Sequence, residues 1–329
     1  MHTFTTDQRQ ATTRMSKVSI IVPIYNELEN ILPLHTQLVH ALDRLTNDWE
    51  IVLVNDGSTD GSTQAIDQIA ASSPKTKVVH FRRNFGQTAS IMAGIDYSSG
   101  DIIVTMDGDL QNDPEDIGAL LNKLDEGYDV VSGWRHSRQD TEWGRRWPSQ
   151  AANRLISWMS RLRLHDYGCT LKVYRRWTIE NVRLYGEMHR YIPIYASWQG
   201  ARVAELPVTH HSRVHGKSKY GLSRIRRVLL DLIVIFFLDR AMDRPMQFFG
   251  TAGLYLFGAA LLAGLYAVAL RVFEGVSFIL TPLPLLFSLL TIAALLCFFF
   301  GVLAEVQMRT YFETRNKRAY LVRETRNID

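Results

Sequence analysis

Residues 101–114, which decide the fold, read DIIVTMDGDLQNDP. The run 101–106 is mostly apolar, as expected of a strand that is buried on both faces of a sheet. Two carboxylates, Asp107 and Asp109, follow on either side of Gly108, a small residue that lets the backbone approach a ligand. At that spacing both carboxylates can turn toward one divalent cation, because hard cations prefer oxygen ligands. The stretch therefore predicts a buried strand that presents an acidic pair at its carboxyl end.

The segments around this stretch alternate between strand and helix patterns. Apolar runs predict strands at 18–23, 50–55, 77–81 and 130–133. Helical patterns occupy about 29–45, a segment ending near 71, 87–97 and 114–126. Such alternation predicts an α/β domain with a mainly parallel sheet and helices on both faces. Ligands of such sheets bind beyond the carboxyl ends of the strands, where the polar residues of this chain collect.

Two further polar turns follow the first and second predicted strands. They read Pro23-Ile24-Tyr25-Asn26-Glu27 and Asn55-Asp56-Gly57-Ser58-Thr59-Asp60. Taken singly, each is an ordinary strand-to-helix turn in which Asn26 or Thr59 could cap a helix. Together with the acidic pair, they favour one ligand site at the edge of the sheet.

These motifs resemble those of the family 2 glycosyltransferases, which have a GT-A fold. Further runs are similar to the subgroup that transfers sugars to polyprenyl phosphates, which includes dolichol-phosphate mannose synthase and the bacterial undecaprenyl-phosphate glucosyl and aminoarabinosyl transferases. The runs are Arg83-Asn84-Phe85-Gly86-Gln87, Asp166-Tyr167-Gly168-Cys169 and Gly216-Lys217-Ser218-Lys219-Tyr220. Two positions depart from many relatives, which have Asp in place of Asn55 and Ala in place of Gly108. The first departure leaves the base or ribose contact open, and the second has little chemical consequence.

The resemblance implies a GT-A domain over 17–222 and a role for each motif residue. The nucleotide-sugar is expected to bind Pro23, Tyr25, Glu27, Asp56 and Asp107. Asp107 and Asp109 are expected to hold Mg²⁺ or Mn²⁺, and Asp109, Gln111 and Asp166 to take part in catalysis. The acceptor phosphate is expected to bind Arg135, Arg213, Ser218 and Lys219, because cationic side chains suit phosphate oxygens. Asp166 is a general base or an orienting residue, since a phosphate monoester is largely dianionic at neutral pH.

The implied reaction moves one sugar from a nucleotide-sugar to polyprenyl phosphate with inversion at the sugar. The donor is expected to be a UDP-hexose, with glucose first, and GDP-mannose or a UDP-aminoarabinose as alternatives. A processive polysaccharide synthase is disfavoured, because Trp143 and Val173 stand where its Q-x-x-R-W motif needs Gln. A non-catalytic scaffold is disfavoured because both acids of the pair are present. His210, His211 and His215 are expected to contact phosphate or solvent rather than a metal, and Cys169 to pack in the core.

Two C-terminal segments are long and apolar enough to span a bilayer. They run from about 247 to 270 and from about 278 to 302, inside a membrane region of 246–305. The segment 223–245 has arginines at one end of an apolar run and is expected to lie along the membrane surface as an amphipathic helix. Arginine and lysine flank the hairpin on its outer ends, so the catalytic domain and both termini, including a basic tail at 306–329, are expected in the cytoplasm.

Composition limits the remaining possibilities. A net charge of +4 and a pI near 9.0 do not argue for nucleic-acid binding. The two cysteines are far apart in sequence, which disfavours disulfides and indicates a reducing compartment. Residues 1–16 are polar, lack a signal-peptide pattern and are expected to be a disordered tail. The resemblance, with its two-helix C-terminus, implies a bacterial inner-membrane enzyme, and a homo-oligomer is compatible with the sequence without being determined by it.

Overall fold

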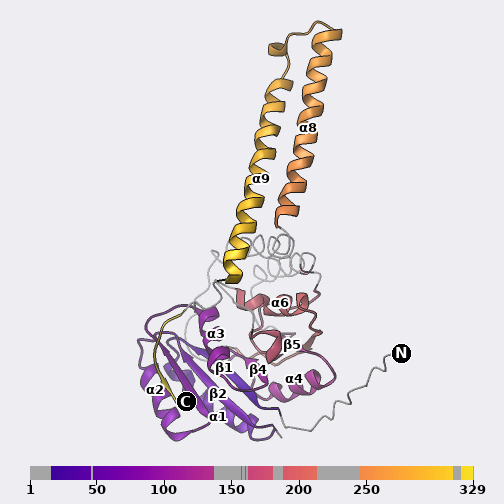
Figure 1. Cartoon of the computed structure of the whole chain (residues 1–329). Helices are drawn as coiled ribbons and strands as arrows, with labels where there is room; N and C mark the ends of the chain where they lie inside the picture. Colours follow the sequence, from indigo (N-terminus) through magenta and orange to yellow (C-terminus); the bar gives the residue numbers. More distant parts are fainter. Residues whose placement is uncertain are drawn as a thin grey trace, which may run out of the picture. The chain divides into compact units, whose positions relative to one another are not determined.

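The chain forms two compact units (Figure 1). The structure is a computed structural model that describes residues 16–45, 47–136, 157, 160, 162–180, 188–212, 245–313 and 320–328. One unit comprises Met1–Arg224 together with Arg318–Asp329, and the other comprises Ile225–Lys317. The C-terminal residues therefore belong to the same unit as the predicted catalytic domain.

The first unit is built on one eight-stranded sheet. Its strands are β1 (Val18–Ile24), β2 (Trp49–Asn55), β3 (Thr76–Phe81), β4 (Ile102–Thr105), β5 (Val130–Trp134), β6 (Lys172–Arg175), β7 (Val203–Pro207) and β8 (Val322–Arg326). They are arranged in the order β7-β5-β6-β4-β1-β2-β3-β8. β6 and β8 run antiparallel to their neighbours, and the other pairs are parallel. The carboxyl ends of β1, β2, β4 and β5 thus meet at one edge, which confirms the mainly parallel α/β sheet.

Helices cover both faces of this sheet (Figure 1). The first face carries α1 (Leu28–Leu42), α2 (Ser62–Ser72) and α4 (Asp116–Asp125), and the second carries α3 (Gln87–Tyr97), the 3₁₀ turn η2 (Met188–Tyr191) and α6 (Ile192–Trp198). Side chains of a strand alternate between faces, so Ile20 and Val22 pack with the first set and Ile21 packs with the second. Each element of the alternating pattern predicted between residues 18 and 133 is present.

The C-terminus differs from the predicted basic tail. Residues 306–329 were expected to form one cytoplasmic tail, but helix α9 continues to Glu313 and residues 322–326 form β8 beside β3. The Asn327 side-chain amide donates to the carbonyl oxygens of Ala70 and Thr76, both at 2.8 Å. The strand reads VRETR, and its charges suit an exposed sheet edge, which is why its composition indicated a tail.

Tyr320 fastens this strand to the sheet, and its removal is expected to release the strand. Its ring is 4% exposed, stacks on Phe81 at 5.1 Å and donates its hydroxyl to Asp96 at 2.6 Å. Tyr320→Ala should cost about 3 kcal/mol of local stability, as large-to-small core changes do. Amide hydrogen exchange of 322–326 should accelerate on the order of a hundredfold. Leu321→Ala, whose side chain is 60% exposed, is the matched control and should leave exchange unchanged.

The second unit contains two long apolar helices, α8 (Pro245–Phe273) and α9 (Leu283–Glu313). The stretches Met246–Phe273 and Leu283–Gln307 are long and apolar enough to cross a membrane. The second helix begins later than the predicted residue 278, because 278–280 form a 3₁₀ turn before Pro282. Large apolar side chains point outward from both helices, and Leu262 and Leu265 are 70% and 66% exposed. A lipid environment suits such a surface better than water does.

Small residues bring α8 and α9 together as an antiparallel pair (Figure 1). On α8 they are Gly253, Ala260 and Ala267, and on α9 they are Ala294 and Gly301, all buried and spaced by seven residues. A methyl group at Gly253 would come within 3.1 Å of the Ala294 carbonyl oxygen. Close backbone approach of this kind is how helices pack in membranes, where burial in lipid supplies no drive of its own.

Candidate active site

The turns after β1 and β2 are joined by hydrogen bonds into one structure. Asn26 has a positive φ of 53°, and its backbone N–H donates to Ser58 Oγ at 3.0 Å. Its side-chain oxygen accepts the N–H of Thr59 at 2.8 Å, and Asp60 Oδ2 accepts the N–H of Leu28 at 3.1 Å. The two predicted nucleotide-binding turns therefore form a single rigid edge.

Neither Asn26 nor Thr59 caps a helix. The N-cap residues of α1 and α2 are Glu27 and Gly61, and neither of these makes a side-chain cap hydrogen bond. The Asn26 side chain accepts a hydrogen bond from the neighbouring turn instead, so the helix-capping role expected for the isolated turns is wrong. Tyr25 is 37% exposed on the same edge.

The side chains of Asn55 and Asp56 are buried at this edge and hydrogen-bonded within the protein. The Asn55 amide donates to Thr63 Oγ1 at 2.8 Å and lies 3.0 Å from His80 Nδ1. Asn55, which replaces the Asp of many relatives, is therefore part of a buried polar network. Asp56 accepts the backbone N–H groups of Phe85 and Gly86 at 2.6 and 2.9 Å. Burial raises the pKa of Asp56, although these two N–H groups favour its ionised form. Its role in nucleotide binding stays a prediction.

Gly57 has no room for a side chain, and an alanine there is expected to displace the turn before α3. A Cβ at Gly57, where φ is +70°, would lie 2.6 Å from the Arg83 carbonyl carbon and 2.7 Å from Asn84 N. Gly57→Ala should weaken binding at the predicted nucleotide site about tenfold or more, because the turn held by Asp56 must move. Calorimetric titration with UDP and Mn²⁺ measures the change.

Gly61→Ala is the matched control for this prediction. Its φ of +94° carries the same backbone penalty of about 1–2 kcal/mol, but its Cβ would meet only the Leu28 side chain, at ordinary distances of 3.4 and 3.9 Å. Equal losses of UDP affinity in the two variants would contradict the steric explanation.

The acidic pair lies directly after β4, as the sequence predicts. Asp107 Oδ1 accepts the side-chain amide of Gln87 at 2.6 Å, and Asp109 Oδ1 accepts the N–H of Gln111 at 3.2 Å. Leu110, which lies between Asp109 and Gln111, has a positive φ of 61°. This conformation turns the chain back and keeps Gln111 close to Asp109. Gln87 ends the run Arg83-Asn84-Phe85-Gly86-Gln87, and no pattern in the sequence assigns it to this acid.

Gly108 is required by packing. A Cβ there would lie 2.9 Å from Ile24 Cδ1 and 3.1 Å from the Pro23 carbonyl oxygen. The glycine thus lets the turn lie against the end of β1. An alanine at this position would need the Ile24 side chain to shift, so the departure from many relatives has a steric consequence here.

The two acids fit a divalent cation. Burial, together with the negative charge of Asp109, raises the pKa of Asp107 to about 6. A bound dication would relieve that repulsion. Within the described part of the chain, no group of three or more His, Cys, Asp or Glu side chains could hold a metal. Two carboxylates completed by substrate phosphates and water are a usual Mg²⁺ environment.

Arg135 and Asp166 form a bidentate ion pair beside the acidic pair. Arg135 Nε donates to Asp166 Oδ2 at 2.7 Å and Nη2 donates to Oδ1 at 3.0 Å. Burial alone would lower the pKa of Arg135, but the hydrogen bonds and charge of Asp166 raise it. The guanidinium also stabilises the ionised form of Asp107. The structure therefore brings the predicted catalytic acid and the predicted phosphate-binding arginine together, close to the predicted metal ligands.

Several other predicted residues cannot be placed relative to the acidic pair. Arg213, Ser218 and Lys219, the predicted surface helix at 223–245 and His215 fall outside the described residues. Cys169 is 1% exposed in the core, and burial raises the pKa of its thiol to about 11, as suits a packing role.

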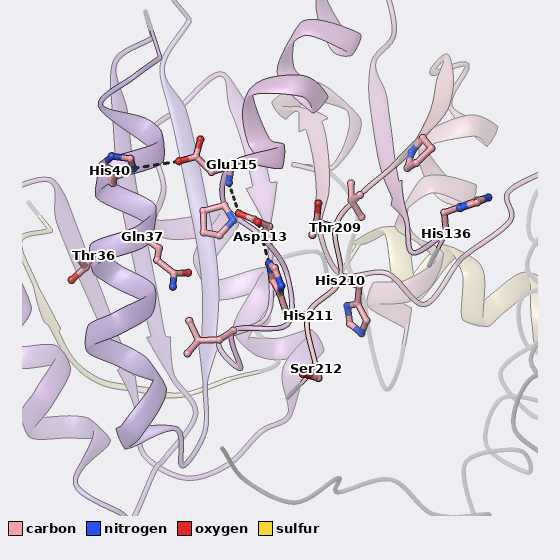
Figure 2. A pocket seen from close by; sticks show the side chains of 14 residues that line it. Thr36, Gln37, His40, Asp113, Glu115, His136, Thr209, His210, His211 and Ser212 are labelled. Atoms are coloured by element: carbon pink, nitrogen blue, oxygen red, sulfur yellow. Dashed lines mark hydrogen bonds and ion pairs between the residues drawn. The ribbon is translucent and has the colours of Figure 1, made fainter. Parts of the chain in front are cut away.

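A groove of about 1080 Å³ lies beside the acidic turn (Figure 2). Its walls are α1, the residues around Asp113 and the segment 207–212. His211 Nε2 is 3.0 Å from Asp113 Oδ2, and His40 faces Glu115 at 3.3 Å (Figure 2). His210 and His211 thus line a groove, with His211 held by an acidic neighbour.

Comparison with known proteins identifies the family. The Glycosyl transferase family 2 description matches residues 19–183. The chain is 40% identical over 312 residues to the dodecaprenyl-phosphate galacturonate synthase of Rhizobium johnstonii, covering 94% of this chain and 92% of the relative. It is 33% identical to the undecaprenyl-phosphate 4-deoxy-4-formamido-L-arabinose transferase of Aeromonas hydrophila, covering 95% and 94%.

Solved structures agree in fold. The glucosyl-3-phosphoglycerate synthase of Mycobacterium tuberculosis, in complex with Mn²⁺, UDP-glucose and phosphoglyceric acid, has a TM-score of 0.54 at 18% identity, covering 68% of this chain and 81% of that one. This likeness confirms the GT-A fold of the first unit. With the family match and the relatives above, the chain belongs to glycosyl transferase family 2 and is a glycosyltransferase, similar over nearly its whole length to enzymes named for joining sugars to polyprenyl phosphates.

Proposed function

We propose that this enzyme transfers one sugar from a UDP-sugar to the phosphate of a polyprenyl lipid at the bacterial inner membrane. The observation that carries the proposal is the adjacency of two unlike elements: the acidic pair Asp107–Asp109 and the buried Arg135–Asp166 ion pair. The first suits a metal-bound diphosphate and the second suits a phosphate nucleophile. Relatives named for sugar transfer to polyprenyl phosphates support the same pairing of substrates.

On the donor side, Asp107 and Asp109 would hold Mg²⁺ or Mn²⁺. Such an ion stabilises the negative charge that gathers on a departing nucleoside diphosphate. Tyr25, Glu27 and Asp56 follow the neighbouring strands and are proposed to bind the nucleoside, with Pro23 at the end of β1. The structural neighbour that binds Mn²⁺ and UDP-glucose supports a metal and a uridine donor.

On the acceptor side, Arg135 is proposed to bind the lipid phosphate. An oxygen of that phosphate attacks the anomeric carbon of the sugar as the bond from this carbon to the diphosphate oxygen breaks, which inverts the configuration. The phosphate needs no general base, because its second pKa is about 6. Both carboxylate oxygens of Asp166 already accept hydrogen bonds from Arg135, and Oδ1 also accepts the Gly168 N–H at 2.9 Å. This arrangement favours the orienting role over the general base.

We propose that α8 and α9 form a membrane hairpin with both chain ends in the cytoplasm. The excess of Arg and Lys outside the two helices supports this orientation. β8, which follows α9, pairs with β3 of the sheet that precedes α8 in sequence. An even number of crossings returns the chain to the side where it began, as this pairing requires.

The experiment that tests the proposal uses the purified full-length enzyme with undecaprenyl phosphate, Mg²⁺ or Mn²⁺ and single nucleotide-sugars. The panel holds UDP-glucose, UDP-galacturonate, UDP-4-deoxy-4-formamido-arabinose and GDP-mannose. UDP-glucose is the hexose expected from the sequence, and the next two donors match sugars in the names of relatives. Mass spectrometry should find an undecaprenyl-monophosphate sugar with one UDP donor. A lipid product from GDP-mannose alone would contradict the uridine donor, and a product bearing several sugars would contradict single transfer.

A further inference from the structure

The turn η2 reaches the candidate site from the second face of the sheet. His189 in this turn is 5% exposed, and its Nδ1 lies 2.7 Å from Thr88 Oγ1 in the first turn of α3. Thr88 follows Gln87, whose amide donates to Asp107. The turn is therefore fixed to the same short helical segment that contacts the first acid of the pair.

A buried lysine holds the other side of this turn. Lys172 of β6 is 2% exposed, and its Nζ donates to the Tyr167 carbonyl oxygen at 3.2 Å and to the Arg190 carbonyl oxygen at 3.4 Å. The same ammonium thus connects the loop that carries Asp166 to the backbone of Arg190. A lysine is rarely buried in a sheet without such partners, so the position of Arg190 is determined from two directions.

Arg190 is half-buried in this turn, between the Thr88 contact of His189 and the Lys172 contact of its own carbonyl group. These two contacts place its positive charge between the helix that contacts Asp107 and the loop that carries Asp166. A guanidinium in this place offers a planar fork of N–H donors, which suits phosphate oxygens.

The charges of the site leave room for this cation. Without Arg190, three carboxylates, Asp107, Asp109 and Asp166, stand against two cations, Arg135 and Lys172. The lipid phosphate adds a charge of about −2, and a nucleotide-sugar diphosphate adds a similar amount. One bound dication offsets only half of that addition. A half-buried arginine on this side would offset part of the remainder where little water reaches.

We propose that Arg190 is a further phosphate-binding residue of the transfer reaction, in addition to Arg135 and the later basic residues. The proposal rests on the function proposed above, because that reaction brings the phosphate groups. The phosphate has two possible sources, the diphosphate of the donor and the phosphate of the lipid. Lys172 and His189 act through Arg190 as positioning residues.

The test measures binding to the full-length enzyme in detergent micelles. One arm titrates UDP in the presence of Mn²⁺, and the other titrates farnesyl phosphate. Arg190→Gln should weaken binding in at least one arm about tenfold or more, and Arg190→Lys should restore part of it by keeping the charge. The arm that responds identifies the source of the phosphate. Uridine and farnesol, which lack phosphate, should bind wild type and variant alike.

Arg202→Gln is the matched control. The Arg202 side chain is 69% exposed beside Asp129 and precedes β7, at the opposite edge of the sheet from the acidic pair. Its replacement should change neither arm. If Arg190→Gln does not fold, Arg190→Lys is compared with the wild type instead. Its affinity for the responding ligand should then be about threefold weaker or more. Unchanged binding of both ligands by a folded Arg190 variant would overturn the inference. Failure of the wild type to bind either ligand would instead count against the proposed function.

Discussion

Asp109→Ala is expected to lower the rate of sugar transfer about a thousandfold, which corresponds to about 4 kcal/mol of transition-state stabilisation. Asp109 is 7% exposed, and its carboxylate is one of the two proposed to hold a divalent ion. Without it the charge of the departing diphosphate would be poorly stabilised. Asp107→Ala should behave in the same way.

The fold should survive this change. Asp109 accepts the Gln111 backbone N–H within its own turn, and its charge contributes to the raised pKa of Asp107. The loss of that hydrogen bond is offset by the loss of like-charge repulsion, so the thermal unfolding temperature should stay close to that of the wild type.

The measurement is the initial rate of lipid-linked sugar formation at saturating donor, over a titration of Mn²⁺. Asp101→Ala is the matched control, because Asp101 is exposed and precedes the same strand at its opposite end. It should keep the wild-type rate. Undiminished transfer by both Asp107→Ala and Asp109→Ala would contradict the metal-binding role.

The strands that build the site were predictable because most of their residues are apolar. Five predicted strands, β1 to β5, are buried on both faces, and each ends where polar residues begin. β6 was missed because it is four residues long and begins with Lys172. That lysine is buried for its contacts with two carbonyl groups, which lie five and eighteen residues away. A composition pattern carries no sign of such partners.

The site was predictable as a list of residues and not as a set of contacts. Arg135 and Asp166 were assigned to different roles, and their bidentate pair joins residues thirty-one positions apart. Asp56 was expected to hold the nucleoside, which stays a prediction, and its hydrogen bonds to the turn before α3 were not foreseen. Arg190 sits in a short turn with no distinguishing motif. These contacts depend on the order of strands across the sheet, which places β6 between β4 and β5 and places β3 beside β2.

Arg135 and Asp166 are expected to act as one unit in transfer. Their side chains are only 14% and 11% exposed, and two hydrogen bonds fix the guanidinium. Arg135→Gln should lower kcat/KM for polyprenyl phosphate about a hundredfold, because a buried, hydrogen-bonded charge is lost from the acceptor side. Asp166→Asn should cost a similar amount, because Arg135 then loses its ionic partner and its fixed orientation.

The double variant separates the two roles open to Asp166. If Asp166 orients Arg135, the double variant should lose no more than Arg135→Gln alone, since the orienting residue has nothing left to orient. If Asp166 removed a proton from the acceptor, the two losses would multiply to about ten-thousandfold. Steady-state kinetics with varied polyprenyl phosphate at saturating donor distinguishes these results. Arg326→Gln is the matched control, because it breaks a 3.2 Å ion pair with Asp67 beside β8 and should leave kcat/KM unchanged. Multiplicative losses in a folded double variant would restore the general base and reject the orienting role.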